Sequence, residues 1–180
     1  RGEIDNTHRQ IVSQVVAGFS LEQIKSLFSK MKPDDPIGYF ADVLRSGKIK
    51  GVALFAGCKN LRTVDRKDIV VIAKELMKRD ILILTTGCNA VEFATKGLMD
   101  PEIAKANAGP GLNAVLSELA AATDIKDGLP CVWHIGSCVD NSRYAEFATD
   151  VAKKMGVEIR DLPFVATAPE AMHEKAISIG

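Results

Sequence analysis

Three of the four cysteines occupy equivalent places in the sequence. Each follows an apolar stretch and two small residues: Ala-Gly precedes Cys58, Thr-Gly precedes Cys88 and Gly-Ser precedes Cys138. Small residues let the backbone approach a bulky group closely. The separations, 30 residues from Cys58 to Cys88 and 50 from Cys88 to Cys138, lack the short Cys-x-x-Cys pairs of most structural zinc sites. Soft thiolates collected from separate loops favour an iron–sulfur or nickel–sulfur centre.

Two other interpretations of these cysteines stay open on the residues alone. A single reduced cysteine is among the most buried residue types, so each of the three, taken alone, favours packing in the core. A nucleophilic thiol is the second alternative, but that chemistry needs one activated cysteine and a general base. Repetition at three equivalent places therefore favours the metal–sulfur hypothesis.

The remaining cysteine and the histidines carry less information. Cys131 lies inside the apolar stretch 130–135, which predicts a role in core packing. His134, near the end of that stretch, is a weak candidate for a ligand or proton carrier, and a hydrogen-bonded core histidine is the alternative. His8 and His173 lie on predicted helices, where a solvated face is expected.

The elements that must position the cysteines alternate between strand and helix from residue 51 onward. The predicted strands cover residues 51–56, 81–85, 130–135, 157–160 and 164–166. The predicted helices cover residues 66–79, 90–97, 101–108, 112–122, 141–155 and a last segment from 169. This order predicts an α/β, Rossmann-like, doubly wound fold with a mainly parallel sheet. The three cysteines then converge at the carboxyl edge of the sheet, near helix N-termini that favour the thiolate.

The region before residue 50 is predicted to be helical only. Helices are expected over residues 7–18, 21–30 and 37–45, and Ser20 with Gln23 forms a capping-box pattern before the second of them. We therefore predict a helical lead-in segment at 1–48 and a Rossmann-like cluster-binding domain at 49–180. The chain opens at Arg1 rather than at a methionine, so we expect it to be a fragment of a larger enzyme.

Composition excludes several classes of function. Lys plus Arg and Asp plus Glu both number 23, so the net charge is zero and no basic field for nucleic acid exists. The apolar runs are far shorter than the roughly 20 residues of a membrane helix. Four cysteines in 180 residues are too few for a small disulfide scaffold. We expect no nucleic-acid partner and no membrane span.

Four segments resemble one enzyme family. Residues 133–143, Trp-His-Ile-Gly-Ser-Cys-Val-Asp-Asn-Ser-Arg, resemble the signature of the nickel-dependent carbon monoxide dehydrogenases. Residues 56–60 and 86–88 resemble that family's Ala-Gly-Cys-Asn-Asn and Thr-Gly-Cys segments, in the same order and at similar spacing. Residues 168–176 resemble its Ala-Pro-Glu-x-Met-x-Glu-Lys-Ala segment. The resemblance covers most of the chain from residue 47 to its end.

The resemblance implies roles for individual residues. Cys58 and Cys88 would bind irons of a nickel-iron-sulfur cluster, Cys138 would bind its nickel, and Lys175 would face the substrate. The implied reaction is the reversible oxidation of CO with water to CO2, two protons and two electrons. The family further implies additional 4Fe-4S clusters in an upstream part, a ferredoxin-like acceptor, a homodimer and an association with acetyl-CoA synthase. A cytoplasmic location is expected, with membrane association only through partners.

Departures from the family pattern leave alternatives. Lys59 follows Cys58 where the family usually has asparagine, which changes the surroundings of the cluster. The family's upstream histidine and two further cysteines are absent from this chain, so we expect the isolated fragment to be inactive. The related hybrid cluster proteins, which reduce hydroxylamine, share the cysteine pattern but differ in the third motif, and they are the first alternative. A metal-free α/β interaction module is the second.

Overall fold

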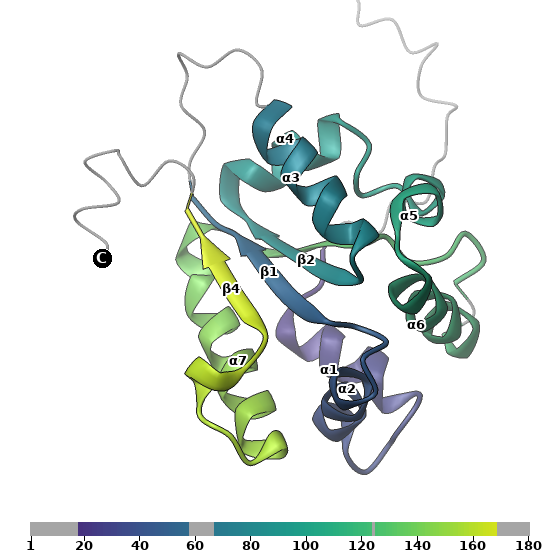
Figure 1. Ribbon diagram of the computed structural model, residues 1–180, viewed down its shortest axis with the longest axis vertical. Helices are drawn as coiled ribbons and strands as arrows, with labels where there is room; N and C mark the ends of the chain where they lie inside the picture. Colours follow the sequence, from purple (N-terminus) through teal and green to yellow (C-terminus); the bar gives the residue numbers. More distant parts are fainter. Residues whose placement is uncertain (1–17, 58–66, 124, 169–180) are drawn as a thin grey trace, which may run out of the picture.

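Four strands of the part of the chain that the structure describes form a parallel sheet (Figure 1). The computed structural model describes residues 18–57, 67–123 and 125–168. The strands are β1 (Gly51–Phe55), β2 (Ile81–Thr86), β3 (Val132–Gly136) and β4 (Phe164–Thr167), in the order β3-β2-β1-β4. After β3 the chain crosses to the far side of β1, so the order reverses between β1 and β4. The predicted α/β, Rossmann-like fold with a parallel sheet is confirmed.

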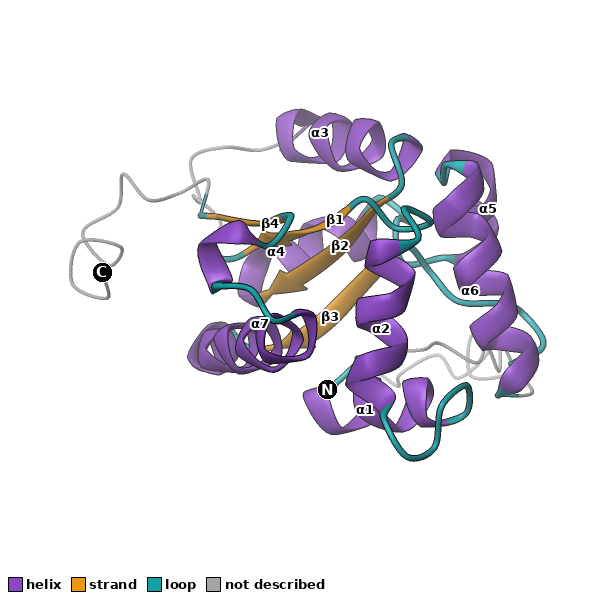
Figure 2. Cartoon of the chain, turned by 60° about the horizontal axis from the view of Figure 1, so that its bottom comes forward, coloured by secondary structure: helices purple, strands orange, loops and turns teal. Residues whose placement is uncertain are grey.

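Helices connect the strands and cover both faces of the sheet. They are α1 (Leu21–Ser29), α2 (Pro36–Arg45), α3 (Lys67–Lys78), α4 (Gly87–Thr95), α5 (Pro101–Asn107), α6 (Pro110–Ala122) and α7 (Asn141–Met155). Figure 2 shows α3 on one face of the sheet and α7, with α1 and α2 beside it, on the other. No helix in the described ranges is long and apolar enough to cross a membrane.

Local sequence signals explain where several helices begin and end. The backbone N–H of Gln23 donates to Oγ of Ser20 at 3.2 Å, and the Gln23 side chain accepts from the N–H of Ser20 at 2.9 Å. This is the predicted capping box of α1. Helix α7 ends at Gly156, whose φ of 71° is left-handed and suits a residue without a Cβ. The predicted segment 7–18 falls almost wholly outside the described residues, and the predicted helix from 169 lies outside them.

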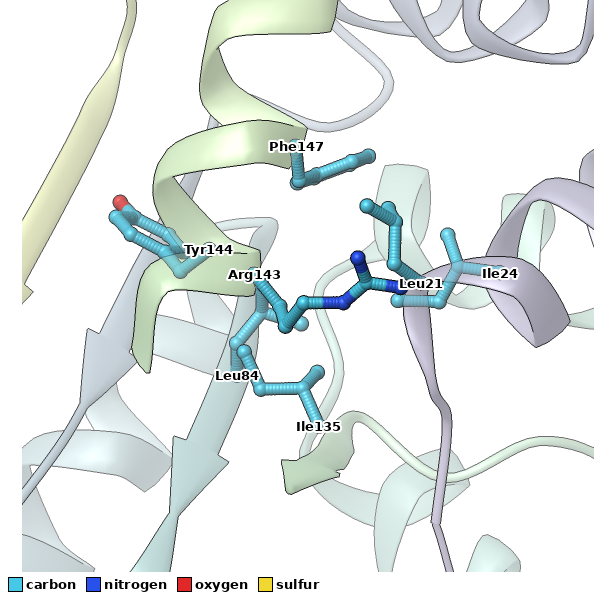
Figure 3. A pocket seen from close by; sticks show the side chains of 7 residues that line it. All are labelled: Leu21, Ile24, Leu84, Ile135, Arg143, Tyr144 and Phe147. Atoms are coloured by element: carbon cyan, nitrogen blue, oxygen red, sulfur yellow. The ribbon is translucent and has the colours of Figure 1, made fainter. Parts of the chain in front are cut away.

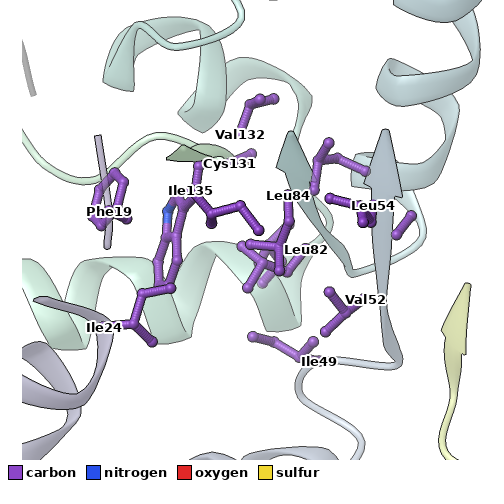
Figure 4. Packing of buried hydrophobic residues seen from close by; sticks show 14 of the residues in the cluster. Phe19, Ile24, Ile49, Val52, Leu54, Leu82, Leu84, Cys131, Val132 and Ile135 are labelled. Carbon is purple, nitrogen blue, oxygen red and sulfur yellow. The ribbon is translucent and has the colours of Figure 1, made fainter. Parts of the chain in front are cut away.

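The core joins the first helices to the sheet. Every residue of β1 is buried, as continuous apolar strands of a parallel sheet are. The ring of Trp133, which is 1% exposed, stacks on Phe19 with centroids 4.6 Å apart. Phe40 of α2 packs on Phe147 of α7 at 5.3 Å. One hydrophobic cluster therefore extends from α1 and α2 through the strands (Figure 4). The domain boundary expected at residue 48 stays a prediction.

The prediction of a strand at residues 157–160 is wrong. Residues Ile159–Asp161 form a short 3₁₀ helix, and Val157 and Ile159 are 39% and 51% exposed. The place beside β1 is taken by β4, whose Val165 pairs with Ala53 in parallel register. A short run of alternating residues forms a strand only where a neighbour accepts its hydrogen bonds, and among the described strands β4 holds that position.

Asp80 anchors the amino ends of three elements. It precedes β2 in a left-handed conformation with φ 63° and is only 5% exposed. Its carboxylate accepts from the backbone N–H of Gly111 at 2.9 Å and Leu112 at 3.0 Å, at the start of α6, and from Nζ of Lys50 at 3.1 Å, just before β1. Burial raises the pKa of Asp80, but these hydrogen bonds and the Lys50 charge outweigh it, so the net shift is downward from 3.8.

We expect Asp80→Asn to lower the free energy of unfolding by about 1 to 2 kcal/mol at pH 7, because it weakens a helix cap and removes an ion pair. Asparagine tolerates the left-handed backbone, so the charge is the main change. Because the pKa of Asp80 is lowered in the folded state, its contribution is complete above 3.8 and is lost as the pH falls through the lowered value. Urea unfolding followed by the fluorescence of Trp133, at pH 7 and at pH 3, measures both effects.

Asp34→Asn is the matched control, because it removes the same charge from a side chain that is exposed. It should change stability by less than about 0.5 kcal/mol at either pH. Equal effects of the two substitutions at pH 7 would contradict the anchoring role of Asp80.

Candidate functional site

The two described cysteines that were predicted as ligands lie at the carboxyl edge of the sheet. Cys88 is the second residue of α4, which begins directly after β2 at Gly87, three residues before the predicted start. Cys138 opens a short 3₁₀ helix, Cys138–Asp140, that leads into α7. Both cysteines are exposed. Because β2 and β3 are parallel neighbours, the segments that carry the two thiols leave the sheet side by side.

Gly87 brings the cysteine-bearing segments together. Its φ of 59° is left-handed, and a Cβ at this position would overlap Sγ of Cys138. The same Cβ would lie 3.1 Å from the carbonyl oxygen of Gly57, the residue before Cys58. The loops after β1, β2 and β3 therefore meet at Gly87. Cys58 itself lies outside the described residues, and so does Lys175.

Two buried side chains connect these loops by hydrogen bonds. Thr86, the last residue of β2, is 0% exposed, and its Oγ1 donates to Oδ1 of Asn141 at 2.7 Å. Asn89, on the first turn of α4, is 1% exposed, and its Nδ2 donates to the carbonyl oxygen of Ala56 at 2.7 Å. Sequence reasoning missed all three polar residues. The available signal was that each flanks a predicted ligand within three positions in the chain.

The turn that contains Cys138, from Ser137 to Asp140, is closed by Asp140. The backbone N–H and the hydroxyl of Ser137 donate to Oδ2 of Asp140 at 2.7 and 2.8 Å. These hydrogen bonds, aided by the nearby His134, hold the pKa of Asp140 below its usual value, so the carboxylate is charged at neutral pH. The charged side chain packs under Gly136, whose φ is 141°. This closed turn fixes the direction in which Cys138 leaves β3.

His134 and Cys131 both lie on the β3 segment, before the residues that meet Gly87. The backbone oxygen of His134 accepts from the N–H of Phe19 at 2.7 Å, and its ring is partly buried. Cys131 is 0% exposed, and burial raises the pKa of its thiol to about 12. A thiol buried in apolar surroundings is inert as a metal ligand, because burial disfavours the thiolate. Cys131 therefore packs in the core, as predicted.

The described residues do not form a complete metal site. Within them, no group of three or more His, Cys, Asp or Glu side chains is arranged to hold a metal ion. Cys88 and Cys138 are two soft donors, and the third predicted donor, Cys58, directly follows in the sequence Gly57, whose carbonyl oxygen lies beside Gly87. This edge can thus supply part of the coordination sphere of a larger centre.

A small pocket lies between α1, α7 and the sheet (Figure 3). It encloses about 210 Å³, including space open to solvent, and none of its lining residues is Cys, His, Asp or Glu. The lining residues are Leu21, Ile24, Leu84, Ile135, Arg143, Tyr144 and Phe147. Arg143 is already paired with Glu22 and with Glu146. The pocket offers no alternative metal site.

Fold and site together define a doubly wound α/β protein with thiols at the carboxyl ends of neighbouring parallel strands. Residues 3–180 match the Prismane/CO dehydrogenase family. The chain belongs to this family.

Within this family, the chain is similar to several carbon monoxide dehydrogenases. The chain is 47% identical over 165 residues to carbon monoxide dehydrogenase 1 of Carboxydothermus hydrogenoformans, a match that covers 92% of this chain and 26% of that protein. The solved structure of carbon monoxide dehydrogenase IV from the same organism matches with a TM-score of 0.86 and 46% identity, over 92% of this chain and 26% of that one. This chain spans about a quarter of the length of the curated relatives it matches.

A third match is an acetyl-CoA synthase/carbon monoxide dehydrogenase. Its TM-score is 0.86 and its identity 40%, over 92% of this chain and 25% of that chain. That structure contains NiZn[Fe4S4] and NiNi[Fe4S4] clusters in its closed and open alpha subunits.

We expect Gly87→Ala to displace Cys138, because the added Cβ overlaps its Sγ and the left-handed backbone is strained by about 1 kcal/mol. Gly47→Ala is the matched control: Gly47 has a φ of 73°, and a Cβ there would have no atom within 4 Å. The measurement is the rate at which a maleimide labels Cys138 in the reduced, metal-free protein, followed by mass spectrometry. Gly87→Ala should change this rate and Gly47→Ala should not. Identical labelling in both variants would contradict the close contact.

Proposed function

We propose that this chain is part of a nickel-iron-sulfur carbon monoxide dehydrogenase, which oxidises CO with water reversibly to CO2, two protons and two electrons. The observation that carries the proposal is the meeting of the cysteine-bearing loops at Gly87, in a chain 47% identical to a carbon monoxide dehydrogenase. The names of the relatives do not favour the hybrid cluster alternative. The donor set supports the proposal, since soft thiolates suit nickel and iron.

We assign the three cysteines unequal roles in this cluster on the basis of the motif resemblance. Cys58 and Cys88 would bind iron, and Cys138 would bind nickel. The absent Cβ of Gly87 supports a shared centre for Cys88 and Cys138, because it lets Sγ of Cys138 approach the segment that carries Cys88. When bound, the cluster supplies Lewis-acid and redox chemistry at neutral pH. The protein's part is to hold the thiols at fixed positions, and the Ser137–Asp140 turn does so for Cys138.

Lys175 is proposed to stabilise the substrate as it acquires negative charge. A lysine ammonium can donate hydrogen bonds to a developing carboxylate, which by analogy with oxyanion donors contributes about 3 kcal/mol. This assignment depends on the segment 168–176 and its resemblance to the family's closing segment.

The rest of the enzyme is proposed to come from the longer protein. It would supply the remaining cluster ligands and the further 4Fe-4S clusters that carry electrons to a ferredoxin-like acceptor. A homodimer, a cytoplasmic location and an association with acetyl-CoA synthase are part of the same proposal, the last supported by the similarity to an acetyl-CoA synthase/carbon monoxide dehydrogenase. The isolated 180 residues should not oxidise CO.

Cys138→Ala in the anaerobically purified full-length protein tests the assignment. We expect it to remove nickel and CO oxidation, because a direct thiolate ligand is lost. Cys131→Ala is the matched control, since it deletes a thiol that is 0% exposed and lies in the core. It should lower stability and leave the nickel content per iron unchanged. Metal analysis and a CO-dependent dye reduction assay measure both.

Each alternative function gives a distinct result in this experiment. Unchanged nickel in Cys138→Ala would refute the nickel assignment. An unsubstituted protein with iron and sulfide but no nickel would indicate a hybrid cluster protein, and one with neither metal would indicate a metal-free module.

A further inference from the structure

The ends of β2 and β3 are irregular where the two cysteine-bearing segments begin. Thr85 pairs with His134, but Thr86 pairs with Gly136, so β3 has one extra residue between these pairs. A bulge of this kind bends a strand and redirects the residues that follow it. The ladder between β2 and β3 therefore does not by itself determine where Cys138 lies relative to Cys88.

A side-chain hydrogen bond continues the connection beyond the bulge. Oγ1 of Thr86 donates to Oδ1 of Asn141 at 2.7 Å, across 55 positions in the sequence. Thr86 precedes Cys88 by two residues, and Asn141 follows Cys138 by three, as the first residue of α7. Only short, hydrogen-bonded segments separate this bond from the two thiols.

Thr85 shows what a purely structural threonine does at this edge. It is as buried as Thr86, at 0% exposed, and its Oγ1 donates to the carbonyl oxygen of Phe55 at 3.1 Å. Phe55 and Thr85 are already register partners in the β1–β2 ladder. The Thr85 bond thus repeats a constraint of the sheet, whereas the Thr86 bond links β2 to α7, which no ladder joins.

We propose that Thr86 and Asn141 are positioning residues that set the separation of Cys88 and Cys138 and thereby determine how tightly the centre binds nickel. The inference rests on the proposed function and assigns a role to residues that do not touch the metal themselves. Residues that orient metal ligands typically affect metal affinity about 10- to 100-fold. The buried hydroxyl of Thr86 suits this role, because a buried donor without its partner is costly and the bond is therefore maintained.

The test compares Thr86→Val with Thr85→Val in the full-length protein. Both variants remove one hydroxyl from a fully buried threonine of the same strand. The reduced, nickel-depleted protein is dialysed anaerobically against buffered free nickel, and bound nickel is measured together with the electron paramagnetic resonance spectrum. Thr86→Val should bind nickel about tenfold more weakly and show an altered spectrum. Thr85→Val should match the unsubstituted protein in both, and Thr86→Ser, which keeps the hydroxyl, should restore binding.

Asn141→Ala tests the same bond from its partly exposed end, so the result does not depend on whether Thr86→Val folds. It should weaken nickel binding as Thr86→Val does. The inference is overturned if the variants of Thr86 and Asn141 bind nickel as Thr85→Val does. If the unsubstituted full-length protein binds no nickel, the proposed function fails instead.

Discussion

The contact between Sγ of Cys138 and the bare Cα of Gly87 is the constraint on which the carboxyl edge depends. Any side chain at position 87 would separate the segments that follow β2 and β3, and the left-handed φ of 59° independently favours glycine. The same conformation lets α4 begin directly after β2, which places Cys88 on its first turn. One missing Cβ therefore controls both the approach of Cys138 to the segment that carries Cys88 and the start of a helix.

At the opposite, amino edge of the sheet, a polar side chain and a glycine also bring segments together, but there they stabilise the fold. There the carboxylate of Asp80 caps α6 and pairs with Lys50, while Gly109 lets the α6 start approach this carboxylate closely. The Asp80 carboxylate is buried and its hydrogen bonds are satisfied, so it stabilises the fold without offering an acceptor to a ligand. At the carboxyl edge the thiols are exposed instead. This division follows the general rule that open α/β sheets bind ligands beyond the carboxyl ends of their strands.

Features set by nearby residues could be predicted from the sequence, and those set across the fold could not. The capping box at Ser20 and the stop at Gly156 are local, so the bounds of α1 and α7 were predicted closely. The supposed strand at 157–160 failed because strand pairing depends on a distant neighbour. The early start of α4 was missed because tertiary contact holds Gly87 in its conformation. In the site, repetition indicated the cysteines as candidate ligands, but the partner of Thr86 lies 55 positions away, where no sequence pattern indicates it.

Surroundings, rather than residue type, separate the structural cysteine from a candidate ligand. Cys131 and Cys138 are seven residues apart at the two ends of the β3 segment. Burial raises the pKa of Cys131 to about 12, so it remains a neutral thiol inside the core. Cys138 lies beyond the bulge, on a turn whose shape is maintained by Asp140 and next to a glycine that leaves room for its sulfur. A single strand thus places one thiol where ionisation is unfavourable and another at the edge where the cysteine-bearing loops meet. A metal centre there needs ligands that are already oriented, and the hydrogen bonds around Cys138 supply that orientation.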